Sequence, residues 1–122
     1  MIYLDNAAST PVLEEVFQEM IPYLKESYGN PSSIHKFGRE AMYAIQKARK
    51  QVAGIINANQ RDVIFTSGGT EANNLAIKGA ALRMREINPR KKHIVTSSIE
   101  HEAVLEPIKD LERIGFEVTY LP

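Results

Sequence analysis

The chain has 122 residues, of which 43% are hydrophobic and 25% are charged. Fifteen Lys and Arg balance fifteen Asp and Glu, and this neutrality argues against general nucleic-acid binding, which needs a basic excess. The absence of cysteine excludes disulfides and thiolate zinc sites, and no apolar run approaches the ~20 residues that cross a bilayer. We therefore expect a cytoplasmic protein with no membrane association and no metal site.

The first sixty residues predict an extended start and two helices. Residues 1–5 have the pattern of a short strand. Thr10 followed by Pro11 is typical of a helix N-terminus, so the first helix is expected to begin there. After a turn at residues 29–33, apolar residues recur at three- and four-residue steps and predict a second helix over 34–56.

The rest of the chain predicts strands that alternate with helices. Three short apolar runs, 62–66, 93–97 and 116–121, are expected to be strands, with helices over 71–87 and 101–114 between them. This order predicts a βαβαβ unit with a mainly parallel sheet and right-handed crossovers, which is an α/β fold. Parallel sheets are normally covered on both faces and have more strands, so we expect a piece of a larger architecture or a chain that needs a partner.

The turn before the helix at 71–87 is a candidate anion site. Gly68 and Gly69 allow a ligand to approach the backbone, and the helix that follows presents N–H groups to an anion. The hydroxyls of Ser67 and Thr70 offer further hydrogen bonds to phosphate oxygens. The alternative is a tight turn with Thr70 as the N-cap. Because the segment fits neither the Walker nor the dinucleotide glycine pattern, it favours phosphate without identifying the ligand.

A second candidate site is the turn at 97–102, which contains His101. Ligand sites in open parallel sheets gather at the carboxyl ends of strands, so this turn and the glycine turn are expected at the same edge. An imidazole there can stack on an aromatic cofactor ring or move protons near neutral pH. The alternative is an ordinary histidine at a helix start. Asn30 and His35 are interpreted as turn and packing residues, and Leu105 stands where a zinc-protease motif needs its second ligand.

Five segments that span nearly all of the chain carry a family resemblance. They are YLDNAASTP at 3–11, YGNPSSIH at 28–35, IFTSGGTEANNLAIKG at 64–79, EHEAVL at 100–105 and GFEVTYL at 115–121. In this order and spacing they resemble the N-terminal part of the cysteine desulfurases of the NifS/IscS type. These enzymes are class-V aminotransferases that bind pyridoxal 5′-phosphate and belong to fold type I.

The resemblance implies the N-terminal part of an aspartate-aminotransferase-like fold that works as a homodimer. Residues 1–20 would belong to the family's small domain, and residues 21–122 to the cofactor-binding large domain, which would be incomplete at its C-terminus. By the same resemblance, Gly69 and Thr70 grip the cofactor phosphate. His101 stacks over the pyridine ring and, as the catalytic residue within this chain, assists proton transfer.

The family reaction converts L-cysteine to L-alanine and leaves the sulfur on an enzyme cysteine as a persulfide, which passes it to an iron–sulfur scaffold or another sulfur acceptor. The family's Schiff-base lysine, its pyridine-facing aspartate, its substrate-binding arginine and its persulfide cysteine lie beyond the position where this sequence ends. We therefore expect the chain to be inactive alone, as a truncated form, a fragment or one part of a split enzyme completed by a C-terminal part. Two alternatives remain: a segment of a related pyridoxal phosphate lyase or transferase, or a non-catalytic binding or dimerisation module.

Overall fold

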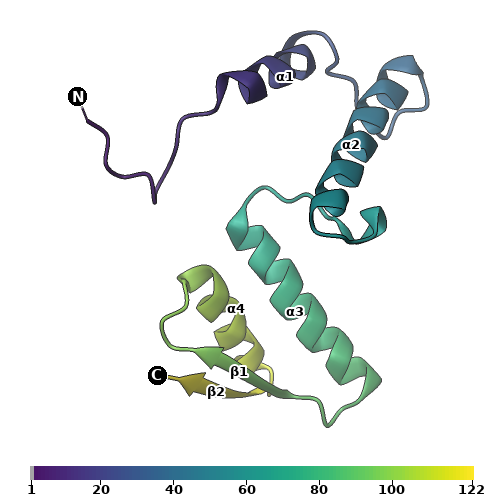
Figure 1. Cartoon of the computed structure of the whole chain (residues 1–122). Helices are drawn as coiled ribbons and strands as arrows, with labels where there is room; N and C mark the ends of the chain where they lie inside the picture. The colour runs from purple at the N-terminus through teal and green to yellow at the C-terminus, as the bar shows by residue number, and fades with distance from the viewer. Residues whose placement is uncertain (1) are drawn as a thin grey trace. The chain divides into compact units, whose positions relative to one another are not determined.

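The computed structural model describes residues 2–122 (Figure 1). The chain divides into two compact units, one that ends at Ile64 and one that runs from Phe65 to Pro122. The domain boundary predicted at residue 20 concerns the domains of a longer protein, and it stays a prediction.

The first unit is helical. Its elements are α1 (Glu14–Lys25), α2 (Lys36–Ile55) and the short 3-10 helix η1 (Gln60–Asp62). The first helix starts later than predicted. Its N-cap position is Leu13 instead of Thr10, and no side chain caps its start. Glu14 and Glu15 occupy its first turn, where carboxylates are stabilised by the positive end of the helix dipole. Residues 2–5 form no strand, and Met1 lies outside the described residues.

Helix α2 confirms the prediction from apolar spacing to within two residues at each end. Its N-cap is His35, whose Nδ1 accepts a hydrogen bond from the N–H of Gly38 at 3.4 Å. In the preceding turn, Asn30 Oδ1 accepts from the N–H of Ser32 at 2.9 Å. Both residues therefore serve the local structural roles that were predicted for them.

The second unit alternates helices with strands. Its elements are α3 (Gly69–Ile87), β1 (His93–Ser97), α4 (Glu102–Arg113) and β2 (Glu117–Leu121). The two strands pair in parallel, with His93 opposite Glu117 and Ser97 opposite Leu121. Gly115 has a φ of +91° after α4, a conformation that favours glycine and lets the chain turn into β2. The last two predicted strands and the helices around them are confirmed.

The strand predicted at residues 62–66 is not formed. Asp62 closes η1, and Val63 has extended backbone angles of −88° and 121° without a paired neighbour. A strand is defined by hydrogen bonds to an adjacent strand, which sequence pattern alone does not provide. Within the described residues, the parallel sheet is therefore β1–α4–β2 instead of the full βαβαβ unit, while the α/β class holds.

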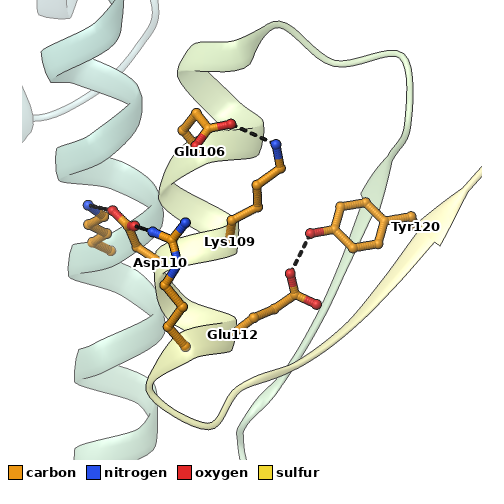
Figure 2. Close-up of polar contacts among 7 residues, drawn as sticks. Glu106, Lys109, Asp110, Glu112 and Tyr120 are labelled. Atoms are coloured by element: carbon orange, nitrogen blue, oxygen red, sulfur yellow. Dashed lines mark hydrogen bonds and ion pairs between the residues drawn. The ribbon is translucent and has the colours of Figure 1, made fainter.

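Helix α4 forms the centre of the second unit and packs against both α3 and β2. Its buried face consists of Ala103, Pro107, Ile108 and Leu111, and Phe116 joins this core. Polar contacts hold the layers together at the edge of this core. The Tyr120 hydroxyl of β2 donates to Glu112 of α4 at 2.8 Å (Figure 2).

Candidate functional site

Helices α3 and α4 lie side by side and run in the same direction. Lys78 Nζ of α3 donates to Asp110 Oδ2 of α4 at 2.7 Å. Further along both helices, Arg85 Nη1 donates to the carbonyl oxygen of Ile114 at 3.0 Å. From the first contact to the second, the residue number rises in both helices. The helices therefore run parallel and begin at the same end of this unit (Figure 1).

The predicted site residues lie at this shared end. Thr70 precedes Lys78 by eight residues and His101 precedes Asp110 by nine. At a rise of 1.5 Å per residue, these spacings place the two residues about 12 Å and about 14 Å from the level of the ion pair. The structure thus brings Gly69 and Thr70, at the start of α3, to the same end as His101, at the start of α4.

The carboxyl ends of the strands reach the same edge as the start of α4. Ser97 ends β1, and only residues 98–100 separate it from His101. The N–H of Ser98 donates to the carbonyl oxygen of Leu121 at the end of β2, at 2.7 Å. This is the edge at which parallel α/β sheets hold their ligands.

Most hydroxyls of the glycine turn are used within the turn itself. Thr66 Oγ1 donates to the carbonyl oxygen of Gly68 at 3.2 Å, and Ser67 Oγ donates to Glu71 Oε2 at 2.6 Å. The expectation that the Ser67 hydroxyl serves a phosphate is therefore wrong for this conformation, since its proton already has an acceptor. The Thr70 hydroxyl, in contrast, has no hydrogen-bond partner within residues 2–122 and is available to a ligand.

The start of α3 is open and rich in donors. Its N-cap is Gly68, not Thr70, and no side chain caps it. The first N–H groups of a helix have no partner within it, and they carry the positive end of the helix dipole. A Cβ atom on Gly68 or Gly69 would meet no other atom within 4 Å. The glycines are thus not demanded by packing inside this chain, and they leave backbone donors accessible to an anion.

His101 has a defined orientation as the N-cap of α4. Its Nδ1 accepts a hydrogen bond from the N–H of Ala103 at 3.0 Å. In the neutral ring, an accepting Nδ1 requires that Nε2 carry the proton. The cap therefore fixes the tautomer and holds the imidazole at the site edge. Both sequence interpretations hold in part: His101 is a helix-start residue, and it lies where a ligand site is expected.

Glu71 is the residue of this turn that the sequence interpretation passed over. Its carboxylate accepts the N–H and the hydroxyl of Ser67, both at 2.6 Å on Oε2. These two hydrogen bonds lower the pKa of Glu71, and desolvation opposes them. The contact resembles a capping box in which the glutamate reaches one residue further back than usual. The available sequence signal was the pair Ser67 and Glu71, four residues apart at a helix start.

The part of the chain that the structure describes offers neither a cluster of metal-ligating side chains nor a membrane-spanning helix. Within residues 2–122, no group of three or more His, Asp or Glu side chains is arranged to hold a metal ion. None of the helices in that range combines the length and the apolar character needed to cross a membrane.

Residues 2–122 match the family described as aminotransferase class-V, so the chain belongs to that family. It is 56% identical over 121 residues to the cysteine desulfurase IscS of Dictyoglomus turgidum, a match that covers 99% of this chain and 30% of that protein. A solved NifS-like protein matches with a TM-score of 0.87 at 42% identity, over 96% of this chain and 31% of that one. The structure described as SspA in complex with cysteine matches with a TM-score of 0.86 at 45% identity. This match covers 98% of this chain and 33% of that one.

These findings confirm the predicted resemblance to NifS- and IscS-type proteins and the aminotransferase-type α/β fold. The chain spans about 30% of the length of the relatives that it matches.

Proposed function

We propose that this chain is the N-terminal portion of a pyridoxal phosphate-dependent cysteine desulfurase, with L-cysteine as substrate and L-alanine as product. Its class-V aminotransferase membership and its 56% identity to an IscS desulfurase support this function. The similar SspA, which is described in complex with cysteine, supports the choice of substrate. In this proposal, residues 1–20 belong to the small domain of the enzyme and residues 21–122 to its large domain.

The residues at the start of α3 fit the phosphate of the cofactor. The N–H groups of Gly69 and Thr70 and the Thr70 hydroxyl can each donate a hydrogen bond, which suits an anion with three acceptor oxygens. No atom lies within 4 Å of the position that a Cβ on Gly68 or Gly69 would take, so neighbouring groups do not block the approach of phosphate oxygens to these N–H groups. The positive end of the α3 dipole adds an attraction of about 0.3–1 kcal/mol for an exposed anion.

His101 acts on the ring of the cofactor. Pyridoxal phosphate, when bound, supplies the electron sink that stabilises a substrate carbanion. The hydrogen bond from the Ala103 N–H favours one orientation of the His101 ring, and in this proposal one face of that imidazole is assigned to stacking. Its Nε2 holds the proton that can be donated at the site, while Nδ1 remains committed to the backbone. His101 is thus both the stacking residue and the proton-carrying residue of this portion.

The remaining chemistry needs groups that these 122 residues lack. The chain has no cysteine to carry the sulfur, so we infer that it is inactive alone. The complete enzyme is proposed to be a cytoplasmic homodimer that delivers sulfur to an iron–sulfur scaffold or another acceptor. The contribution of this chain is the binding of the cofactor phosphate and ring.

The observation that carries this proposal is that the Thr70 hydroxyl and His101 lie at the same end of the second unit. The test is a titration of the chain with pyridoxamine 5′-phosphate, followed by NMR. This form of the cofactor has no aldehyde and cannot react with the lysines of the chain. We expect shifts of the amide signals of Gly69, Thr70 and Ala103 on binding. Thr70→Val and His101→Ala should each weaken the affinity about tenfold, as expected for losing a charge-assisted hydrogen bond or a ring contact.

Matched controls come from the same unit. Thr119→Val removes a threonine hydroxyl in the middle of β2, and His93→Ala removes a histidine at the amino end of β1. Both should leave the affinity within about twofold of the unmodified chain. Absence of binding by the unmodified chain would contradict a cofactor site in these residues and favour a non-catalytic module. Equal losses in the control variants would show that the effects are not local.

A further inference from the structure

The carboxylate of Glu71 is hydrogen-bonded to Ser67, the residue directly before the N-cap of α3. Two donors of Ser67, its backbone N–H and its hydroxyl, converge on one oxygen of Glu71 at 2.6 Å each. The hydroxyl of Thr66 meanwhile holds the carbonyl oxygen of Gly68 at 3.2 Å. These contacts fix the backbone of residues 66–68 directly before the open N–H groups of α3.

This arrangement prevents the Glu71 carboxylate from competing with a phosphate for the N–H groups at the helix start. A carboxylate in the first turn of a helix is attracted to the same N–H groups that attract a phosphate. A freely rotating Glu71 side chain would compete with an anionic ligand for these donors and would repel it. Because the donors of Ser67 engage the carboxylate, Glu71 does not cap the N–H groups of Gly69 and Thr70.

We propose that Glu71 is a positioning residue for the phosphate site, which acts by clamping Ser67 so that the turn presents the N–H groups of Gly69 and Thr70 to the ligand. This inference rests on the proposed function, since it assigns a role towards the same phosphate. Glu71 itself does not touch the phosphate. Its effect on binding is transmitted through the backbone of the glycine turn.

Whether Glu71→Gln strengthens or weakens the binding of pyridoxamine 5′-phosphate distinguishes this positioning role from a simple charge effect. If Glu71 only contributed negative charge near the phosphate, Glu71→Gln would strengthen the binding of pyridoxamine 5′-phosphate. If Glu71 holds the turn, the same variant weakens binding, because a neutral amide is a poorer acceptor for two donors. We expect Glu71→Gln to weaken the affinity five- to tenfold. Glu86→Gln is the control, since Glu86 lies in the last turn of α3 and pairs with Arg83.

A measurement without ligand tests the clamp directly. We expect the amide signal of Ser67 to report the titration of the Glu71 side chain, because the two groups are hydrogen-bonded. Ser67→Ala removes the hydroxyl donor alone and should move the pKa of Glu71 back towards its usual range. It should also weaken the affinity for pyridoxamine 5′-phosphate two- to fivefold. This milder variant decides the question if Glu71→Gln loses helix content by circular dichroism.

The outcomes distinguish the two proposals. If the unmodified chain does not bind pyridoxamine 5′-phosphate, the cofactor site fails, and this positioning role fails with it. If the unmodified chain binds but Glu71→Gln and Ser67→Ala bind equally well or more tightly, the positioning role alone is overturned. An unchanged pKa of Glu71 in Ser67→Ala would likewise overturn the clamp.

Discussion

Lys78 and Asp110 form a 2.7 Å ion pair that joins α3 to α4. Arg113, one turn further along α4, adds a second hydrogen bond to the other oxygen of Asp110 at 2.6 Å. The Lys78 side chain is 35% exposed and that of Asp110 is 46% exposed, so water screens the pair. The pair marks the level at which the two parallel helices contact each other, and it thereby defines the relative heights of Thr70 and His101.

We predict that this pair stabilises the folded chain at neutral pH and that this contribution is lost in acid. The hydrogen bond from Lys78 and then its charge lower the pKa of Asp110, while desolvation opposes them and Arg113 adds smaller contributions. A lowered pKa in the folded state means that the contribution is complete above the pKa of the unfolded chain, about 3.9. It disappears as the pH falls through the lower folded-state pKa. Asp110→Asn should therefore be less stable than the unmodified chain at pH 7, and the difference should shrink at pH 3. Urea unfolding at both pH values measures this, and a difference that does not change with pH would contradict it.

Leu111 is predicted to be the most sensitive core position of the second unit. It is 1% exposed and lies on the buried face of α4. Leu111→Ala should lower the free energy of unfolding by about 2–5 kcal/mol, because it removes apolar contacts and leaves a cavity. Ile99→Ala is the control, since Ile99 is 87% exposed and should change the free energy by less than about 0.5 kcal/mol. Urea unfolding followed by the NMR signals of α4 reports on this unit alone. Similar losses in both variants would contradict the assigned core.

The parts of the fold that were predictable depend on local signals. Apolar spacing predicted α2 closely, and the turn residues around Asn30 and His35 behaved as expected. The run at 62–66 has strand composition but forms no strand, because strand formation depends on a neighbouring strand and not on the run itself. The late start of α1 has a similar explanation. Thr10 and Pro11 are residue types that suit a helix N-terminus, but they do not determine at which residue the helix begins.

The candidate site was predictable in its residues but not in its hydrogen bonds. Glycines before a helix and a histidine after a strand indicated the two turns as candidate sites, and the family resemblance then assigned Gly69, Thr70 and His101, whose roles towards a cofactor stay predictions. The partner of the Ser67 hydroxyl could not be predicted, because Glu71 and a phosphate compete for the same donor. The tautomer of His101 depends on a single backbone contact that only coordinates reveal.

Two glycines of α2 should respond to alanine in opposite directions. A Cβ on Gly38 would lie 2.1 Å from the carbonyl oxygen of Ser33, so Gly38→Ala requires the turn at 30–33 to move away from the helix. A Cβ on Gly54 would meet no atom within 4 Å. We expect Gly38→Ala to destabilise the first unit by about 1–3 kcal/mol, as overpacking does. Gly54→Ala should stabilise it by about 0.5–1 kcal/mol, because alanine is the better helix former. Thermal unfolding by circular dichroism checks both, and a stabilising Gly38→Ala would contradict the packing of the turn on α2.

Gly69 offers a test of whether a backbone N–H binds the phosphate. Gly69→Ala keeps the N–H and places its Cβ in open space, so the affinity for pyridoxamine 5′-phosphate should change less than threefold. Gly69→Pro removes the N–H at the first helical position, where proline fits the helix and where no bond within the helix is lost. We expect the proline variant to bind about tenfold more weakly while it retains the helix content of the alanine variant. Equal affinities in the two variants would mean that this N–H does not contact the ligand, because the substitutions differ chiefly in the donor. The phosphate would then have to rely on Thr70 and the helix dipole, and the open glycine turn would have no direct part in binding it.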